Sequence, residues 1–535
     1  MSELHHTDGI LMIQGTASDV GKSVIVTALC RIFLQDGYSV APFKSQNMAL
    51  NSYVTIDGRE IGHAQGIQAE ASGIVATTDM NPILIKPTGE MHSQIVVHGK
   101  PHSHLSAVKY REDFLPYAKP LVMEALGRLR DAYDVVVMEG AGSPAEINLK
   151  HRDIVNMNLA EWADAAVILV GDIDRGGVFA FLVGTLELLE PSERKRVKGF
   201  IINKFRGDIS LLKPGLDWLE EKTGIPVFGV LPFVPDLDIE AEDSVVLDSY
   251  PSAAQGDASI DIAVIRYPRI SNFTDFDILA AEPDVSLRYV SKASDLGNPD
   301  AIILPGTKDT IGDLDYVREL GIDKAIREQM NQNERTALVG ICGGYQMLGE
   351  QLHDPEAVES DKPRAAQGLG WLPLSTTFLP GKTTRRIAGA IAEQTAAMLY
   401  PSELALPVSG YEIHAGETMK LEVSAALNSS NEVCYTADQL SDLFEIRESS
   451  RETYRREGVV TFDGRVLGTY IHGLFHNDAW RRAWLNGMRT AKGIAPLSST
   501  FASESRKEAA FNRLADHVRN HIDMDQIYRL LAARH

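Results

Sequence analysis

Cysteine is scarce in this sequence, which has only Cys30, Cys342 and Cys434 among 535 residues. They lie far apart and form no C-x-x-C pair, so neither a disulfide framework nor a zinc knuckle is expected. Long apolar runs are also missing, since none approaches the roughly 18 residues of a membrane span. The polar start of the chain lacks the apolar core of a signal peptide. We therefore expect a cytoplasmic protein.

Basic residues are in deficit as well, with 52 Lys and Arg against 73 Asp and Glu and a net charge of −21. This balance argues against nucleic acid and anionic membranes as partners and favours small-molecule substrates. It does not forbid an anionic substrate, because a basic cluster can act locally. The length exceeds one ordinary core, so two or three domains are expected. The oligomeric state does not follow from the sequence.

A glycine-rich stretch, GTASDVGKS, lies between an apolar run and a segment with helical spacing of apolar residues. It fits the phosphate-binding pattern G-x-x-x-x-G-K-[ST]. Backbone N–H groups and a helix N-terminus would hold the phosphates, Lys22 would reach the β/γ-phosphates and Ser23 would ligate Mg²⁺. The stretch predicts an ATP site whose contact residues include Gly15, Thr16, Asp19, Val20, Gly21, Lys22 and Ser23.

Two later strands of this half end in polar residues. The apolar strand 38–43 runs into a loop with Lys44, Gln46 and Asn47, which we expect to face a substrate. The strand 134–139 ends in Glu139, which fits the second metal-organising acid of phosphate-loop enzymes. Glu139 is therefore predicted to hold Mg²⁺ with Ser23, directly or through water.

Two further strands add candidate residues. The loop after the strand 165–170 carries Asp172, Asp174 and Arg175, a plausible site for a metal or a carboxylate substrate. Asn203 ends the next strand and is expected to contact the nucleotide. Guanine-specific proteins place an Asp three residues after such an Asn, where this chain has Arg206, so ATP is favoured over GTP. Strand–helix alternation predicts a doubly wound, mostly parallel α/β sheet.

The composition shifts to proline, acids and small polar residues over 236–259, which predicts a linker. Strand–helix alternation then restarts, so we expect a second α/β domain with a mostly parallel sheet over 260–485. The first domain is expected over 1–235. The last part, 486–535, has amphipathic helical spacing and is predicted to pack as a helical C-terminal tail.

Cys342 lies in Gly-Ile-Cys-Gly-Gly, directly after an apolar strand. This pattern predicts a nucleophile on a tight strand-to-helix turn, where larger neighbours would clash. The helix N-terminus favours a thiolate, and the backbone N–H groups of Gly306 and Gly343 are expected to bind an oxyanion. Cys30 and Cys434 lack this setting and are predicted to be structural.

A cysteine nucleophile needs a base. His472 follows a late strand, 467–471, where a strand end delivers a side chain, and we predict it as the base. His414, in another glycine-flanked strand, is the alternative; we expect it to be structural or to orient the substrate.

With both motifs in place, the chain resembles the cobyric acid synthase family over nearly its whole length. The glutaminase half matches around Cys342 and in Tyr-Ile-His-Gly at 470–473, and the first half is similar to dethiobiotin synthetase. Further family-like blocks are FKSQNM (43–48), EGAG (139–142), DIDRGG (172–177) and YEIH (411–414).

This resemblance implies an enzyme that amidates the b, d, e and g carboxylates of adenosylcobyrinic acid a,c-diamide, giving adenosylcobyric acid. It implies ATP, Mg²⁺ and glutamine, an acyl phosphate, and ammonia released by a Cys342–His472 pair. Class I glutaminases carry a Glu two residues after the His, where this chain has Leu474. The group that orients the imidazole therefore stays open, as do the amidation order, the corrin contacts and the ammonia route.

Three alternatives remain. The nearest is an enzyme of the cobyrinic acid a,c-diamide synthase type. Another is a ParA/MinD-like switch ATPase, although those proteins carry an early loop lysine where this chain has Thr16 and have no glutaminase domain. A regulatory protein with an inactive glutaminase half is the third, and intact Cys342 and His472 argue against it.

Overall fold

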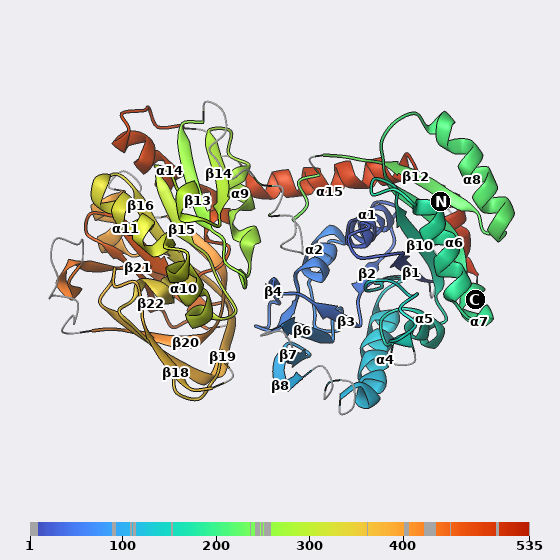
Figure 1. The fold of residues 1–535 in the computed structure, drawn as a ribbon, viewed down its shortest axis with the longest axis horizontal. Helices are drawn as coiled ribbons and strands as arrows, with labels where there is room; N and C mark the ends of the chain where they lie inside the picture. The colour runs from blue at the N-terminus through green and yellow to red at the C-terminus, as the bar shows by residue number, and fades with distance from the viewer. Residues whose placement is uncertain are drawn as a thin grey trace. The chain divides into compact units, whose positions relative to one another are not determined.

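The protein divides into two units, and neither is contiguous in sequence (Figure 1). Unit 1 comprises Met1–Ala49, Glu60–Glu240 and Glu504–His535, and unit 2 comprises Leu50–Arg59 and Ala241–Ser503. The contiguous domain boundaries expected from the sequence stay a prediction. The computed structural model describes residues 9–87, 92–106, 110, 114–150, 153–235, 237–240, 247, 250, 258–360, 362–400, 406–421, 435–449, 451–498 and 502–533. Cys434 and most of the expected linker lie outside these ranges.

Unit 1 is built on a six-stranded parallel sheet in the order β12-β11-β10-β1-β9-β2. Its strands are β1 (Gly9–Gly15), β2 (Val40–Phe43), β9 (Val135–Glu139), β10 (Ala166–Asp172), β11 (Val197–Phe205) and β12 (Val227–Pro232). The central strands are apolar runs, as expected where helices cover both faces. Parallel strands present all their carboxyl ends at one edge, so the phosphate loop, Lys44, Glu139 and Asp172 share that edge.

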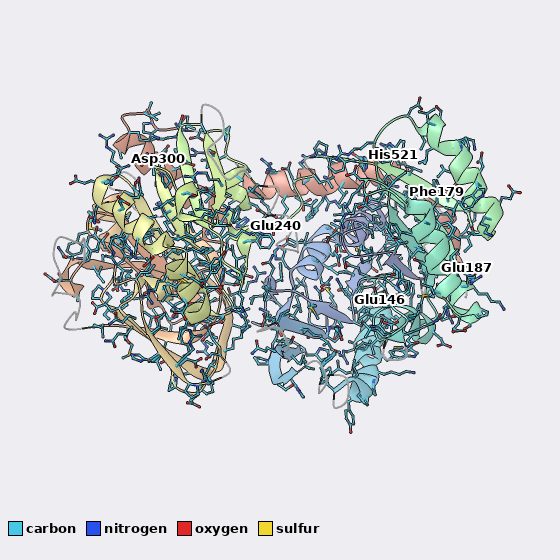
Figure 2. The ribbon with its side chains drawn as sticks, viewed as in Figure 1. Glu146, Phe179, Glu187, Glu240, Asp300 and His521 are labelled. Atoms are coloured by element: carbon cyan, nitrogen blue, oxygen red, sulfur yellow. The ribbon has the colours of Figure 1, made fainter. Side chains whose placement is uncertain are left out.

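A second, four-stranded sheet of unit 1 has the order β3-β6-β7-β8. Its strands are β3 (Gln46–Met48), β6 (Ile83–Pro87), β7 (His92–Val97) and β8 (Lys100–Ser106), and the short strand β5 (Glu60–Gly62) precedes α2. The helices of unit 1 are α1 (Lys22–Gln35), α2 (His63–Ala71), α4 (Leu115–Ala132), α5 (Met157–Ala163), α6 (Val178–Leu188), α7 (Pro191–Arg194), α8 (Ile209–Thr223), α15 (Ser503–Arg519) and α16 (Met524–Ala532). Helices α6 and α8 meet through Phe179 (Figure 2), whose ring packs edge-on against Trp218 with centroids 6.2 Å apart.

The C-terminal helices α15 and α16 complete the core of unit 1. Leu514, Val518 and Ile527 are buried in one hydrophobic cluster with residues of β1 and α1. The turn between the two helices lies against β12 so closely that a Cβ on Gly229 would be 2.1 Å from the backbone oxygen of His521. Helices α15 and α16 are therefore part of the core of unit 1.

Unit 2 contains an 11-stranded sheet whose first part, in the order β14-β13-β15-β16-β23, is parallel. These strands are β13 (Ile260–Ile265), β14 (Val285–Val290), β15 (Ala301–Leu304), β16 (Ala337–Ile341) and β23 (Val466–Thr469). The doubly wound α/β class expected for both halves is confirmed.

The rest of this sheet is a largely antiparallel extension, which the sequence analysis did not predict. Its strands are β17 (Gln351–Asp354), β18 (Arg364–Gln367), β19 (Leu374–Ile391), β20 (Pro407–Lys420), β21 (Leu440–Glu448) and β22 (Arg455–Thr461). The long strand β19 pairs with β17, β20 and β21. A short strand, β4 (Ser52–Val54), also belongs to unit 2.

The helices of unit 2 connect these strands. They are η4 (Phe273–Phe276), α9 (Asp277–Ala280), η5 (Ala293–Asp295), α10 (Thr310–Glu319), α11 (Ile322–Gln332), α12 (Gly343–Leu348), α13 (Glu393–Leu399), η6 (Ala437–Gln439), η7 (Leu474–His476) and α14 (Asp478–Ala491). Across the described ranges of both units, no helix has the length and apolar character needed to cross a bilayer.

Shortening a core side chain of α16 should destabilise unit 1. Ile527 is fully buried, so Ile527→Ala is expected to lower the free energy of unfolding by about 2–4 kcal/mol through lost burial and a cavity. Arg529→Ala, on the exposed face of the same helix, should change it by less than about 0.5 kcal/mol. Urea unfolding followed by tryptophan fluorescence measures both. Equal stability of the two variants would contradict the packing of α16 into the core.

Candidate active sites

The loop between β1 and α1 has a backbone conformation that requires glycine at Gly15 and Gly21. Asp19 and Gly21 have positive φ angles of 57° and 95°, and such angles favour glycine. A Cβ on Gly15 would be 2.5 Å from Val20 Cγ2, and one on Gly21 would be 2.2 Å from Asn203 Nδ2. Asn203 also donates from Nδ2 to the backbone oxygen of Val20 (2.8 Å). It therefore supports the loop from the end of β11.

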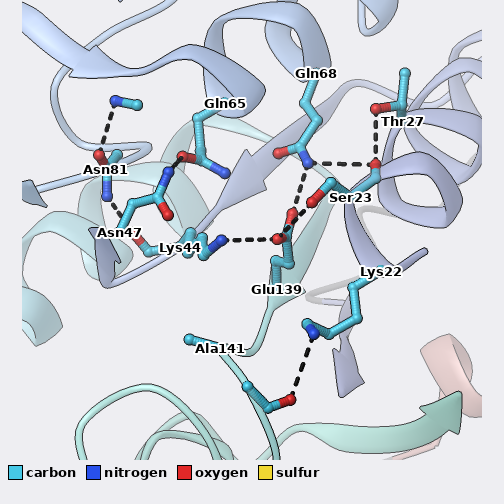
Figure 3. A network of polar contacts seen from close by, with 12 residues as sticks. Lys22, Ser23, Thr27, Lys44, Asn47, Gln65, Gln68, Asn81, Glu139 and Ala141 are labelled. Carbon is cyan, nitrogen blue, oxygen red and sulfur yellow. Dashed lines mark hydrogen bonds and ion pairs between the residues drawn. The ribbon is translucent and has the colours of Figure 1, made fainter. Parts of the chain in front are cut away.

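Glu139, at the end of β9, lies in a buried polar network beside this loop (Figure 3). Its Oε1 accepts hydrogen bonds from Lys44 Nζ (2.8 Å) and Ser23 Oγ (2.9 Å), and its Oε2 accepts from Gln68 Nε2 (2.7 Å). Burial opposes the charge of Glu139, but the ion pair with Lys44, the Gln68 amide and the nearby Lys22 ammonium hold its pKa below the usual range. The carboxylate is therefore ionised at neutral pH.

The Lys22 ammonium lies between two loops, where it donates to the backbone oxygens of Ala17 (3.1 Å) and Gly142 (3.4 Å; Figure 3). The hydroxyl of Ser23 and the carboxylate of Glu139 supply oxygen ligands next to it, which suits Mg²⁺ bound with phosphates. Within the described ranges, no cluster of three or more His, Cys, Asp or Glu could hold a metal alone. A cation here would complete its shell with phosphate and water oxygens.

The ends of β10 and β11 carry a second polar cluster, next to the phosphate loop. The Asp172 side chain is buried. Lys204 Nζ connects this cluster to the phosphate loop, because it donates to the backbone oxygen of Asp19 (2.6 Å). The ion pairs of this cluster are Lys204–Asp172 (2.8 Å), Arg206–Asp174 (2.9 Å), Arg175–Asp19 (3.5 Å) and Arg175–Asp172 (3.8 Å). Asp172, Asp174 and Arg175 thus gather beside the phosphate loop.

The side chains of Lys44, Gln46 and Asn47 contact different partners. Lys44 contributes to the Glu139 network, whereas Gln46 accepts a hydrogen bond from the Tyr110 hydroxyl. Asn47 Nδ2 donates to Gln65 Oε1 of α2 (3.1 Å). Lys44 therefore contacts the Glu139 carboxylate, whereas Gln46 and Asn47 contact Tyr110 and Gln65.

Thr16 lies at the start of the phosphate loop, where its N–H donates to the backbone oxygen of Val170 (2.9 Å).

In unit 2, Cys342 sits on a strained turn between β16 and α12. Its backbone has φ 52° and ψ −109°, a region that L-residues rarely occupy and that is common at active sites. A Cβ on Gly340 would be 2.7 Å from the backbone oxygen of Gly344, and one on Gly344 would be 1.9 Å from that of Leu304. Only glycine fits at these two positions, as in a nucleophile elbow.

His472 lies beyond the end of β23 and is fully surrounded by protein. Its Nδ1 donates to Asp275 Oδ2 (2.7 Å), while the N–H of Gly473 donates to Asp275 Oδ1 (2.8 Å). Burial disfavours a charged ring, but the Asp275 carboxylate and the Cys342 sulfur outweigh it and raise the pKa of His472 to about 10. The imidazole is therefore held in its protonated form beside the cysteine, by an acid that the sequence analysis left unidentified.

His414, the alternative base, has a different environment in β20. Its Nδ1 donates to the backbone oxygen of Gly416 (2.8 Å), and its ring stacks on Tyr470 with centroids 3.7 Å apart. Burial lowers the pKa of His414 to about 4, so this ring is neutral. The contacts to Asp275 and Cys342 favour His472 as the proton carrier.

The two glycines expected to line an oxyanion site both lie at the Cys342–His472 pair. A Cβ on Gly306 would be 3.1 Å from His472 Cε1, and one on Gly343 would be 2.5 Å from Thr307 Cγ2. The loop after β15 and the start of α12 are therefore in contact. Their backbone can approach the nucleophile because neither residue carries a side chain.

Three polar residues of these sites escaped the sequence analysis. Gln68 lies in a segment rich in small residues, which predicted only a close-packed helix, and Asp275 and Asn272 lie around the short helix η4, which matches no motif. Their roles depend on contacts with residues more than 70 positions away for Gln68 and 190 for the others. A single sequence carries no local signal for such pairs.

Comparison with known proteins matches each half of the chain to a family model. Residues 11–246 match the family model "CobQ/CobB/MinD/ParA nucleotide binding domain", and residues 261–480 match "CobB/CobQ-like glutamine amidotransferase domain". A solved structure described as "Crystal structure of glutamine amidotransferase" covers 43% of this chain and 98% of its own, at 15% identity and a TM-score of 0.28. That likeness is too remote to add to the assignment.

Relatives of similar length match nearly the whole chain. "Cobyric acid synthase" of Geobacillus sp. (strain WCH70) is 52% identical over 97% of this chain and 96% of its own. The proteins of the same name from Geobacillus kaustophilus (strain HTA426) and Desulforamulus reducens (strain ATCC BAA-1160 / DSM 100696 / MI-1) are 51% and 50% identical, with 97% of this chain and 97% and 98% of their own covered. The chain therefore belongs to the cobyric acid synthase family and is an ATP-dependent glutamine amidotransferase.

Proposed function

We propose that the chain amidates the b, d, e and g carboxylates of adenosylcobyrinic acid a,c-diamide, using ATP to activate each carboxylate and glutamine as the nitrogen donor. The observation that carries this proposal is the presence of two complementary sites in one chain. Unit 1 has a phosphate loop beside the ionised Glu139. Unit 2 has a strained Cys342 beside a protonated His472. One site suits carboxylate activation, and the other suits ammonia release.

The synthetase reaction needs activation because the oxygen of a carboxylate is a poor leaving group. Transfer of the γ-phosphoryl of ATP to that oxygen gives an acyl phosphate, which ammonia attacks to form the amide and phosphate. Lys22 and the loop N–H groups would stabilise the charge of the transferring phosphoryl group. Ser23 and Glu139 would hold Mg²⁺, which would neutralise phosphate charge when bound. Asp172, Asp174 and Arg175 are candidates for orienting substrate at the same sheet edge.

The glutaminase reaction begins with the Cys342 thiolate and the His472 imidazolium. The sulfur attacks the carboxamide carbon of glutamine, and the N–H groups of Gly306 and Gly343 bind the oxygen that becomes negative. The ring gives its proton to the leaving nitrogen, the C–N bond breaks and ammonia departs. The neutral ring then takes a proton from water, which attacks the thioester and releases glutamate. Asp275 orients the ring throughout.

Replacing the nucleophile should separate the two activities. Cys342→Ala is expected to abolish glutamine-dependent amidation and to spare ammonia-dependent amidation, because only the first needs the thioester. Product formation from the a,c-diamide with each nitrogen donor measures this. Cys30→Ala is the matched control, since burial raises the pKa of Cys30 to about 12 and leaves its thiol unreactive. Loss of both routes in Cys342→Ala would contradict the assignment of ammonia release to the Cys342 site and of amidation to the ATP site.

Removing the charge of Asp275 should weaken glutamine hydrolysis and change its pH dependence. Asp275→Asn is expected to reduce glutamate release on the order of 100-fold, because the ring loses its orientation and its proton. The carboxylate raises the pKa of His472, so the variant ring deprotonates at lower pH. The fall of activity with rising pH should therefore begin at lower pH than in the unaltered protein. Asp277→Asn, two residues along, is the control, and an unchanged profile in Asp275→Asn would refute this role.

Loss of the loop lysine should stop amidation from either nitrogen donor. Lys22→Ala is expected to reduce both rates by about 100-fold or more, because positioning and charge stabilisation supply most of the catalysis of phosphoryl transfer. Lys213→Ala, an exposed lysine of α8, should leave both rates unchanged. Phosphate release and amide formation are followed together. Full activity of Lys22→Ala would refute the assignment of the ATP site.

A further inference from the structure

Residues 305–307, here called the oxyanion loop, follow β15 and include the Gly306 N–H assigned above to the oxyanion. In a trans peptide the carbonyl and the N–H point in opposite directions, so a hydrogen bond to the carbonyl also fixes the direction of the N–H. The carbonyl of Pro305 accepts from the N–H of Gly344 (3.0 Å), and that of Gly306 accepts from the N–H of Ser271 (2.9 Å). Both peptides of the oxyanion loop are therefore held from their carbonyl side.

Thr307 connects the oxyanion loop to the start of α12. A Cβ on Gly343 would be 2.5 Å from Thr307 Cγ2 and 3.1 Å from Thr307 N, so the two residues are in contact. Gly343 supplies the second N–H assigned to the oxyanion. Because such donors act only when they lie about 3 Å from the developing charge, the position of Thr307 governs whether Gly306 and Gly343 can act together.

The side chain of Thr307 is held by a closed ring of hydrogen bonds. Its hydroxyl donates to Asp313 Oδ2 in the first turn of α10, and it accepts from the backbone N–H of Asp309 (3.2 Å). The backbone N–H of Arg269 also donates to Asp313 Oδ2 (3.2 Å), and the backbone oxygen of Arg269 lies 3.1 Å from Thr307 Oγ1. Asp313 is therefore the group through which α10 holds the oxyanion loop.

Asp313 can hold Thr307 in either protonation state. The residue is fully buried, and burial outweighs the hydrogen bond from Thr307 and raises the pKa of Asp313 to about 7. The ionised carboxylate accepts the proton of the Thr307 hydroxyl. The neutral acid can instead donate from Oδ2 to Thr307 Oγ1, whose own proton then points to the backbone oxygen of Arg269. Donors and acceptors match in both arrangements.

We propose that Asp313 is a positioning residue for the oxyanion site, because it fixes the Thr307 hydroxyl and thereby the distance between the N–H groups of Gly306 and Gly343. The inference rests on the glutaminase reaction proposed above. When Thr307 is released, the two donors can move apart as the negative charge forms on the glutamine oxygen. The loss falls on the transition state more than on the bound substrate, so it should reduce kcat for glutamate release rather than raise KM.

Single substitutions test the contact. Thr307→Val keeps the shape of the side chain and removes its hydroxyl, and Asp313→Ala removes the partner. Each should lower kcat for glutamate release about tenfold, with KM within about threefold. Asp313→Asn should recover most of kcat, because its amide oxygen still accepts from Thr307 and Arg269. A normal kcat in Thr307→Val, or no recovery in Asp313→Asn, would overturn the proposal.

Asp315→Ala is the matched control on the same helix. Asp315 is exposed and forms an ion pair with Arg364 (2.5 Å), and its loss should leave kcat within about twofold. Ammonia-dependent amidation should be unchanged in all of these variants, because it does not use the oxyanion site.

The double variant Thr307→Val with Asp313→Ala separates a shared role from two independent ones. If Asp313 acts through the Thr307 hydroxyl, the second substitution has nothing further to remove, and kcat should fall about tenfold as in either single variant. A fall of about a hundredfold, the product of two separate effects, would show that Asp313 acts elsewhere and would overturn the proposal.

Alkylation of Cys342 by iodoacetamide distinguishes a displaced oxyanion loop from a damaged nucleophile. The thiolate attacks the methylene carbon, a C–S bond forms and iodide leaves, so no oxyanion develops. The rate at Cys342, taken as the difference from Cys342→Ala, should therefore stay within about twofold in Thr307→Val. A loss of alkylation that matches the loss of kcat would overturn the proposal. Failure of the proposed function looks different, because Cys342→Ala would then still release glutamate.

Discussion

Each unit has a buried carboxylate at its site, Glu139 in unit 1 and Asp275 in unit 2. Burial alone drives a carboxyl group toward its neutral form, so the charge survives only where cations and N–H donors surround it. Glu139 meets this requirement with Lys44, Gln68 and Ser23. The two oxygens of Asp275 accept hydrogen bonds from the His472 ring and the N–H of Gly473. The partners come from separate segments of the chain. The two sites can therefore form only when those segments are packed correctly.

His414 and His472, both in unit 2, show how burial and neighbouring groups give identical side chains opposite pKa shifts. His414 is buried against Tyr470, with a backbone oxygen as its partner, and its pKa falls to about 4. His472 is buried against a carboxylate and a sulfur, and its pKa rises to about 10. Opposite pKa shifts of this kind indicate which of two titratable groups carries a proton in a reaction. The first ring can act as a neutral packing or hydrogen-bonding group, whereas the second can carry a proton.

Short-range features of the protein were predictable from the sequence. The phosphate loop and the turn at Cys342 are fixed by glycines that sit within a few residues of the functional group, because there a Cβ would collide with nearby backbone or side chains. Apolar runs likewise predicted the parallel strands. Asp275 was not predictable, since nothing in its own surroundings distinguishes it from other acids near a short helix. The antiparallel extension was missed because its pairing involves β19, which reads as a mixed polar strand.

The assignment of residues to the two units likewise depends on contacts that a single sequence does not show. Residues Leu50–Arg59 have no change in composition at their ends, so a boundary drawn from the sequence assigns this segment to the nucleotide-binding half. Its hydrogen bonds assign it to the glutaminase half. An enzyme that releases ammonia at one site and uses it at another loses nitrogen whenever the first site works alone. Residues Leu50–Arg59 belong by sequence to the consuming half and by contact to the releasing half.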